Sequence, residues 1–184
     1  MDRDLVVQAG HGDREAFGVL ARVHADLLYA IAQRILQEMD RSEDAVQQAL
    51  VIAWQELPRL RDPDRFEPWL HRILVRCCYT EARRRRAWSD HVRVLPIEGP
   101  EGPDEIDTIA DRDQLDRGFR RLPPEQRAIL VFHHYLGLTS GEIAETLGVP
   151  AGTVRSRLHY AHRAMRAALE AVERSSSVAG GRSS

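Results

Sequence analysis

The segment from 138 to 163 constrains the fold most strongly, because it contains signals for two helices and for the turn between them. Thr139 followed three residues later by Glu142 is a capping box, which predicts the start of a helix. Gly148 is suited to end that helix in a left-handed conformation. Pro150 then stands where a second helix begins, a position at which its missing N–H has no cost. The segment therefore predicts two short helices joined by a tight turn.

The second of these helices has one apolar and one polar side. Its apolar residues recur at steps of four, three and four, which places them on a common face. The other side carries arginines and hydroxyl groups, with which recognition helices contact DNA. We expect a helix-turn-helix, and the alternative is an ordinary helical hairpin with a solvated basic face. The apolar residues are Val154, Leu158, Ala161 and Met165, and the outward residues are Thr153, Arg155, Ser156, Arg157 and His159.

Charge is distributed unevenly along the 184 residues, although the net charge is only −2. Residues 89–112 carry two arginines against seven acidic residues and also contain prolines and glycines, whereas both flanking regions have helical periodicity. This pattern is typical of a linker between two domains. We therefore expect helical domains over residues 1–88 and 113–174, joined by a flexible acidic linker over 89–112. Residues 175–184 are rich in serine and glycine and are expected to be disordered.

The fold class predicted from these patterns is all-α, because no segment shows a strand signal. Cys77 and Cys78 are adjacent, which excludes a disulfide framework and suits a reducing cytosol. Cys77 falls at a core position, whereas Cys78 is expected off the buried stripe, where the pair could act as a redox switch. No apolar run is long enough to cross a bilayer, so we expect a cytoplasmic protein without membrane insertion.

Residues with the spacing of a catalytic or metal site are not found in the sequence. His133 and His134 are adjacent but have no second pair of ligands at metal-binding distance along the chain. No nucleophile stands with a base, and no glycine-rich loop could hold a phosphate. We therefore expect a protein that is not an enzyme and that needs no metal or cofactor.

The N-terminal half is predicted to contain a helix from Asp13, a second from about residues 40–42 to Pro58, and a third from about 67 to 88. The second helix has a polar face that is short of formal charge, which suits docking to another protein; a plainly solvated face is the alternative. This face comprises Asp44, Gln47, Gln48, Val51 and Gln55.

The third helix carries aromatic residues and arginines together on one face. Rings that stack on unpaired bases, at about 1–3 kcal/mol each, and guanidinium groups that hold phosphates are what single-stranded nucleic acid requires. The alternative is a basic helix end favoured by the helix dipole, with the tryptophan packed into the core. The residues of this face are Trp69, Arg72, Arg76, Tyr79 and Arg83, followed by Arg84, Arg85 and Arg86.

Several motifs, which follow one another in a fixed order along the chain, resemble those of a known family. They are Gly-Asp-Arg-Glu-Ala-Phe (12–17), Ser-Glu-Asp-Ala-Val-Gln-Gln-Ala-Leu-Val-Ile-Ala-Trp (42–54), Phe-Glu-Pro-Trp-Leu-His-Arg-Ile (66–73), Leu-Pro-Pro-Glu-Gln-Arg (122–127) and Gly-Thr-Val-Arg-Ser-Arg-Leu (152–158). With them the chain resembles, over about residues 12–169, the extracytoplasmic-function group of the sigma-70 family. These proteins are the promoter-specificity subunits of bacterial RNA polymerase.

The resemblance implies partners and residue roles. The partners would be core RNA polymerase, through the β′ clamp helices and the β subunit, then promoter DNA and an anti-sigma factor. Asp44, Gln47 and Gln48 would dock on the β′ clamp. The −10 element would be melted and held by Arg61, Phe66, Trp69, Arg72, Arg76 and Arg83, and the −35 element would be read by Thr153, Arg155, Ser156, Arg157 and His159.

One departure from the family pattern concerns the −10 surface. The family often has Asn at the position of Arg76 and Asp at that of Thr80, so the base preference of this surface is open. The linker length is compatible with two promoter contacts: elements two helical turns apart lie roughly 70 Å from each other, and 24 residues extend to roughly 80 Å. Two other classes remain as alternatives, a two-domain regulator with a helical sensor and a redox sensor that uses Cys77 and Cys78.

Overall fold

The described part of the chain is helical, as expected, and contains no β-strand. The computed structural model describes residues 2–91 and 116–180. The N-terminal domain consists of α1 (Asp2–Gly10), α2 (Arg14–Leu36), α3 (Met39–Glu56) and α4 (Phe66–His91), with the 3₁₀ turns η1 (Leu57–Arg59) and η2 (Pro63–Arg65) between α3 and α4.

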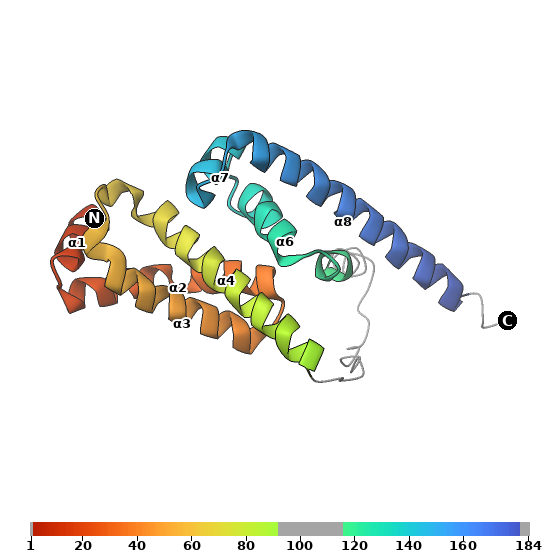
Figure 1. The fold of residues 1–184 in the computed structure, drawn as a ribbon, viewed down its shortest axis with the longest axis horizontal. Coiled ribbons are helices and arrows are strands. Elements are labelled where there is room, and N and C mark those ends of the chain that lie inside the picture. The colour runs from red at the N-terminus through yellow and green to blue at the C-terminus, as the bar shows by residue number, and fades with distance from the viewer. Residues whose placement is uncertain (1, 92–115, 181–184) are drawn as a thin grey trace.

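The C-terminal domain is helical and contains the helix-turn-helix that the sequence predicts. Residues 116–120 form a short helix. It is followed by α6 (Pro124–Leu130), which continues into the π-helical turn η3 (Val131–Tyr135), and then by α7 (Ser140–Leu147) and α8 (Ala151–Gly180). In Figure 1, α8 is the long blue helix that ends near the C-terminus.

The helix α2 begins where the sequence predicts, because Asp13 caps it. The Asp13 carboxylate accepts hydrogen bonds from the backbone N–H groups of Glu15 and Ala16, at 2.9 and 3.1 Å. These are two of the N–H groups that have no partner within the helix itself, and such a cap contributes about 1 kcal/mol. The apolar stripe that follows is completely buried at Leu28 and Ile31.

The helix α1 was not anticipated, since the sequence analysis placed the first helix at Asp13. Its apolar residues Val6 and Ala9 are only 3% and 2% exposed, and they pack in the core of the N-terminal domain. Because α1 has nine residues, it is too short to be stable alone and depends on packing against α2. Charged residues at its start obscured this short apolar pattern.

Two helix ends also differ from the expected boundaries. The helix α4 continues to His91, beyond the expected end at 88, and α8 continues to Gly180, so the expectation of disorder from Ser175 was wrong for residues 175–180. No proline interrupts either extension, and serine or arginine alone does not end a helix. The expected linker, apart from residues 89–91, and the last four residues lie outside the described residues.

The paired cysteines of α4 are both buried, and the expectation that Cys78 lies off the buried stripe was wrong. Cys78 is completely buried, and Cys77 is 6% exposed. Burial raises the pKa of the Cys77 thiol to about 11 and also raises that of Cys78. Because the reactive form of a cysteine is its thiolate, both side chains are unreactive at neutral pH. This observation disfavours the redox-sensor alternative.

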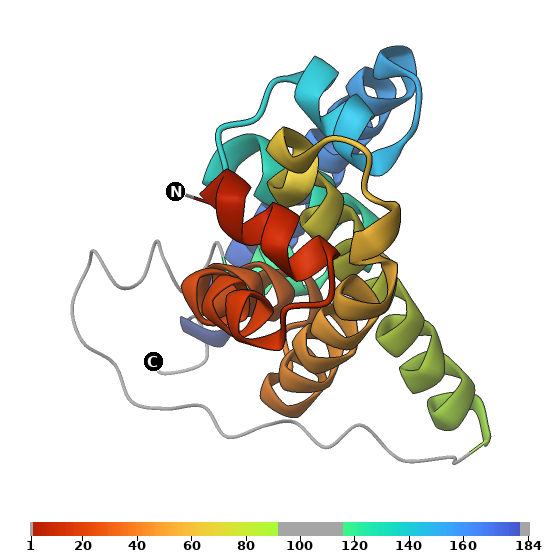
Figure 2. The same cartoon turned by 90° about the vertical axis from the view of Figure 1, so that its left-hand side faces the viewer.

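The two domains pack against each other through α2 and α4 on one side and α6 and α7 on the other. Figure 1 shows α4 running beside α6 and α7, and α2 also contacts α6 directly; Figure 2 gives the same arrangement from the side. The buried His71 of α4 lies 6.2 Å from Phe132 between ring centroids, and the Arg34 guanidinium lies 3.8 Å from the centroid of the Tyr135 ring. This packing determines which candidate site residues are accessible.

Candidate nucleic-acid interface

The helix-turn-helix is held by caps at both ends of α7. The backbone N–H of Thr139 donates to the Glu142 carboxylate at 2.7 Å, and the N–H of Glu142 donates to the Thr139 hydroxyl at 3.3 Å. The hydrogen bonds from Thr139 lower the pKa of Glu142. Gly148 ends the helix with a φ of 66°, the left-handed conformation that glycine adopts without strain. Pro150 immediately precedes α8.

The first turns of α8 present a polar face to solvent. Val154, Leu158 and Ala161 are buried against the rest of the C-terminal domain, which fixes the rotation of the helix. The candidate −35 residues Arg155, Ser156, Arg157 and His159 are exposed, and Thr153 is half-buried. Ser156 also donates its hydroxyl proton to the backbone carbonyl of Thr153 at 2.9 Å. The structure therefore brings these five residues together on one helix surface.

The candidate −10 face of α4 is divided between two environments. Trp69 and Arg72 line a small cavity of about 200 Å³ together with Glu145 and Thr146 of α7. The Arg72 guanidinium lies directly over Gly148, where a Cβ atom would stand 1.5 Å from its Nη2. Its Nε is buried and has no hydrogen-bond partner among the described residues. This part of the face is therefore covered by the helix-turn-helix.

Arg76 and Arg83 lie on the exposed part of α4. Arg76 lines a different cavity, which lies between α3 and α4 and also includes Thr80. The Thr80 hydroxyl donates to the backbone carbonyl of Arg76 at 3.0 Å, and the Arg83 Nε donates to that of Tyr79 at 3.2 Å. The structure thus separates Arg76 from Trp69 and Arg72, although all three follow one helical periodicity.

Tyr79 belongs to α4 and lies near charged residues of the C-terminal domain. The pKa of its phenol is raised to about 12, mainly by burial; the nearby Glu125 acts in the same direction, and Arg157 of α8 acts in the opposite one. Arg157, a −35 candidate, is therefore close enough to the middle of α4 to influence the pKa of Tyr79. In this arrangement the two candidate DNA surfaces are neighbours.

The loop before α4 contains one exposed and one buried candidate. Arg61 is exposed, whereas Phe66 is 5% exposed and belongs to the core. The Phe66 ring lies 5.5 Å from that of His24 and 5.9 Å from that of Trp69, between centroids. Phe66 therefore packs against Trp69 in the core and is not accessible to a nucleotide in this arrangement.

The candidate docking residues lie together on α3. Asp44, Gln47 and Gln48 are exposed beside Val51, which is 47% exposed, and they line the same cavity of about 560 Å³ as Arg76. Val51 is an exposed apolar side chain, and of the three candidate docking residues only Asp44 carries a formal charge, in keeping with the depletion of charged residues at the core of protein interfaces.

The contacts between the domains involve residues that the sequence analysis did not single out. Arg65 of η2 forms an ion pair with Glu145 of α7 at 2.7 Å, and His71 is buried against the C-terminal domain. A histidine at a helical core position gives a signal in the sequence, because it interrupts the apolar stripe. The partners of Arg65 and His71 lie 80 and 61 residues away, and no local pattern indicates them.

Comparisons with known proteins agree with this architecture. Residues 20–88 match the family model described as Sigma-70 region 2, and residues 112–167 match that described as Sigma-70, region 4. The chain is 34% identical over 151 residues to the ECF RNA polymerase sigma factor SigL of Mycobacterium tuberculosis, covering 80% of this chain and 85% of SigL. It is 24% identical to SigW of Bacillus subtilis over 90% of this chain and 95% of SigW.

Solved structures show the same fold. CnrH in complex with the cytosolic domain of CnrY matches with a TM-score of 0.65 and 28% identity, over 92% of this chain and 97% of CnrH. The sigma factor RpoE of Bartonella quintana, in complex with the anti-sigma factor NepR, matches with a TM-score of 0.66 and 22% identity, over 84% and 96% of the two chains.

Two helical domains with these matches define a sigma factor built from regions 2 and 4. The chain belongs to the extracytoplasmic-function group of the sigma-70 family, and its function is that of an RNA polymerase sigma factor. Its relatives are regulatory initiation factors rather than enzymes. Within residues 2–91 and 116–180, no group of three or more potential metal ligands is found, and no described helix could span a membrane.

Proposed function

We propose that this sigma factor directs core RNA polymerase to promoters through two DNA contacts, a duplex contact by α8 at the −35 element and a single-strand contact by α4 at the −10 element. The observation that carries the proposal is the exposed face of α8, which follows a capped first helix and a left-handed Gly148. This is the arrangement by which helix-turn-helix proteins place a recognition helix in the major groove.

At the −35 element the two arginines of this face supply most of the recognition. Arg155 and Arg157 are exposed and can each form paired hydrogen bonds with a guanine or a contact with a phosphate. Thr153, Ser156 and His159 add hydroxyl and imidazole groups for bases or backbone. Contacts to phosphates set the affinity and its salt dependence, and contacts to base edges set the sequence.

At the −10 element, α4 captures bases that have left the stack. Trp69 offers a ring for stacking and Arg72 a guanidinium beside it, while Arg76, Arg83 and Arg61 follow the backbone. Capture of an unstacked base stabilises the separated strands, so melting requires binding energy and no nucleotide hydrolysis.

Use of both surfaces requires the domains to separate. The two elements lie roughly 70 Å apart on a promoter, at about 34–36 Å per helical turn, whereas Arg72 of α4 here packs on Gly148 beside α8. Separation also frees the buried Arg72 Nε, which has no hydrogen-bond partner in the described chain. The packed arrangement therefore represents a state before promoter binding.

Core polymerase and an anti-sigma factor are the proposed protein partners. Asp44, Gln47 and Gln48 form the contact with the β′ clamp helices, and the C-terminal domain lies near the β subunit. CnrH was determined in complex with the cytosolic domain of CnrY, and the sigma factor RpoE in complex with the anti-sigma factor NepR, which supports a comparable protein partner for this chain.

Transcription in vitro tests the proposal. Core polymerase supplied with the purified chain is expected to start transcripts from a subset of a random promoter library, with shared sequences near −35 and −10. Core polymerase alone serves as the control. A chain that binds duplex DNA tightly by itself, but neither co-elutes with core polymerase nor starts transcripts, would instead be a conventional regulator.

A further inference from the structure

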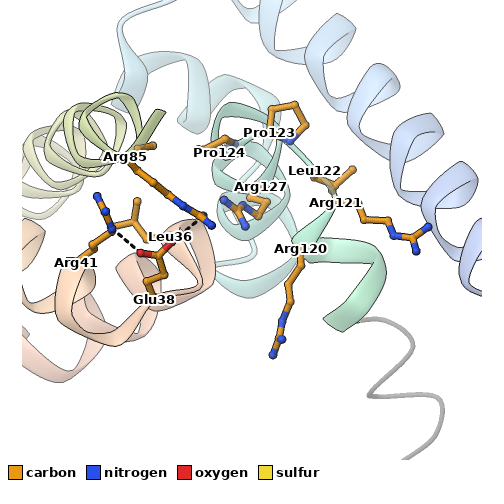
Figure 3. Close-up of a pocket in the computed structure, with 11 residues that line it drawn as sticks. Leu36, Glu38, Arg41, Arg85, Arg120, Arg121, Leu122, Pro123, Pro124 and Arg127 are labelled. Carbon is orange, nitrogen blue, oxygen red and sulfur yellow. Dashed lines mark ion pairs between the residues drawn. The ribbon is translucent and has the colours of Figure 1, made fainter. Parts of the chain in front are cut away.

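A cavity of about 510 Å³ lies where the two domains meet, but charged side chains that line it are engaged within the chain or turned away. Glu38 forms ion pairs with Arg41 and with Arg85. Arg120 and Arg121 point away from the cavity in Figure 3. These charges therefore belong to the packing of the fold and do not define a ligand site.

A second cavity, of about 440 Å³, brings two histidines together. It lies between α2 and the C-terminal domain, and its lining includes His134 of η3 and His162 of α8. Both residues are exposed, and their Nε2 atoms lie 2.8 Å apart. The two histidines are 28 positions apart in the sequence, so no local motif indicates the pair.

The contact between these histidines shows that at least one ring is neutral. At 2.8 Å one nitrogen donates a hydrogen bond and the other accepts it, whereas two protonated rings would both be donors and would repel each other. A neutral imidazole has a free lone pair on one nitrogen, and this is the form that binds metal ions. When both rings carry their proton on Nδ1, both Nε2 atoms are available to one ion.

The separation of the two nitrogens fits a single metal ion. Imidazole nitrogens bind zinc at about 2.0–2.1 Å, and neighbouring divalent metals at similar distances. Two nitrogens at a right angle around such an ion lie about 2.9 Å apart, close to the 2.8 Å between His134 and His162. Right angles occur in square-planar and tetragonal coordination, which is typical of Ni²⁺ and Cu²⁺. The tetrahedral coordination of zinc requires about 3.3 Å, which exposed side chains reach by a small rotation.

The backbone around His134 is also unusual. His133 and His134 belong to η3, which has π-helical geometry. Such turns are rare and occur frequently at functional sites. The Nδ1 of His133 lies 3.0 Å from the backbone carbonyl oxygen of Leu138, and its ring lies 4.8 Å from that of His134 between centroids. His133 therefore packs beside the His134 ring and limits its rotation.

The charges that line this cavity are compatible with a cation. Asp116 contributes a carboxylate to the lining. Arg34 lines the cavity as well, but its guanidinium lies 3.8 Å from the centroid of the Tyr135 ring and donates to the backbone carbonyl of Ala30 at 3.0 Å. In the described part of the chain no third histidine, cysteine or carboxylate completes a metal-binding group, so water fills the remaining coordination positions.

We propose that His134 and His162 together bind a divalent transition-metal ion, which links η3 to α8. His162 lies about two turns beyond Arg155 on the same side of α8. The ion therefore holds the helix that carries the candidate −35 residues against the rest of its domain. A ligand that binds only the folded chain stabilises it. The site does not depend on the proposed promoter contacts, since its test needs neither polymerase nor DNA.

Calorimetric titration of the full chain, without an affinity tag, with nickel chloride tests the site. One ion per chain is expected. His134→Ala and His162→Ala should each weaken binding at least about tenfold, and the double variant should lose no more than either, because one remaining imidazole cannot form the chelate. The matched control is His11→Ala, which removes an exposed imidazole from the turn before α2 and should leave the affinity unchanged.

Two independent surface imidazoles would give a different result. The wild-type chain would then bind two ions, each single variant would bind one, and the affinity of the remaining histidine would be unchanged. This outcome overturns the proposal, as does nickel binding that survives in the double variant.

His162→Gln separates metal binding from a structural hydrogen bond. Its amide can still form a hydrogen bond with His134 but is a poor ligand for these metals. Without metal the melting temperature should stay near that of the wild-type chain, and the increase that nickel produces in the wild type should be lost. If His162→Gln does not fold, His134→Gln is the equivalent variant on the other side of the pair. An equal effect of nickel on the melting temperature of wild type and variant would show that the histidine pair has only a structural role.

Nuclear magnetic resonance locates the ion directly. Nickel is paramagnetic and broadens the signals of nearby nuclei, so the backbone amide signals of η3 and of α8 around His162 should broaden first. In His162→Gln the same amount of nickel should leave these signals sharp. Broadening centred on another part of the wild-type chain, such as Cys77 and Cys78 of α4, would overturn the proposal.

Discussion

The reading face of α8 and the aromatic face of α4 are both proposed to contact promoter DNA, yet they differ in what covers them. Arg155 and Arg157 stand exposed on α8, whereas Arg72 is packed on Gly148 and Trp69 faces α7. The difference suits the two forms of DNA. A duplex exists before the polymerase arrives, so its reader can be open, but unpaired −10 bases appear only later, and their reader can remain covered until then.

One turn, at Gly148, contributes to both surfaces. The turn at Gly148 sets the direction of α8 relative to α7. The Arg72 guanidinium also packs against this turn. A change at this turn therefore affects the duplex reader through its cap and the single-strand reader through its cover. The predictions below separate these effects, beginning with the largest.

The open surface is tested by Arg155→Ala and Arg157→Ala. Whichever arginine forms a bidentate base contact should lose about 1–3 kcal/mol of binding to the −35 element and relax specificity at one position. The other should weaken binding to all sequences and reduce the salt slope by about one phosphate contact. Binding of holoenzyme to promoter variants over a salt series measures both. If selectivity and salt slope are unchanged in each variant, α8 does not read the −35 element.

The covered surface is tested at the turn by Gly148→Ala. A side chain at a φ of 66° costs about 1–2 kcal/mol, and its Cβ would collide with the Arg72 guanidinium. We expect a lower melting temperature and partial separation of the domains. The matched control is Gly152→Ala in the first turn of α8, where nothing lies within 4 Å of the new Cβ.

A second substitution sharpens this result. Combining Gly148→Ala with Arg72→Ala removes the collision but keeps the strained backbone, so the double variant should recover part of the lost stability. Strictly additive losses in this double-mutant cycle would mean that Arg72 does not rest on the turn in solution.

A third surface, on α3, is exposed to solvent, although it belongs to the same domain as the partly covered α4. Asp44→Ala with Gln48→Ala should weaken binding to the isolated β′ clamp by about 0.5–1.5 kcal/mol for each hydrogen bond lost, without changing the melting temperature. Glu43→Ala, an exposed acidic residue in the same helix, is the control. Unchanged affinity of the double variant would remove the docking role from this face.

The smallest expected effect is a pH dependence of the stability, which arises from the buried His71 of α4. Burial lowers the pKa of His71 below its usual value of 6.5, the charge of His24 adds to this, and Glu67 opposes it. The unfolded chain therefore binds the proton more readily, so His71 lowers the stability as pH falls below about 6.5 and has no such effect above it. His71→Phe should reduce the loss of melting temperature between pH 7.5 and 5.5, whereas substitution of the exposed His11 should not. An equal loss in wild type and His71→Phe would contradict this assignment; His134, whose pKa burial also lowers, contributes to both.

The sequence was sufficient wherever a structure depends on near neighbours. The capping box of Thr139 and Glu142, the helix start at Asp13 and the left-handed Gly148 all depend on a few neighbouring residues, and each was predicted correctly. The burial of Val154 and Leu158 also followed from helical periodicity. Local interactions of this kind are encoded by residue type and spacing alone.

Contacts between distant segments could not be predicted in the same way. The periodicity of α4 placed Trp69, Arg72 and Arg76 on one face, but the position of α7 decides which of them is covered. Packing against α2 likewise stabilises the short α1, which its own sequence does not. The roles of the DNA and polymerase contact residues remain predictions, and the structure adds where each residue lies and what must move to expose it.

The central claim, that α4 holds the separated strands at −10, is tested most directly by permanganate reactivity of promoter thymines. Holoenzyme with Arg72→Ala and Arg76→Ala should still form closed complexes, because the −35 contacts of α8 are intact. Its thymines near the start site should remain unreactive, while wild-type holoenzyme and a holoenzyme with Arg163→Ala make them reactive. Normal permanganate reactivity with the double variant would contradict the account and leave α4 as a basic helix without a role in melting.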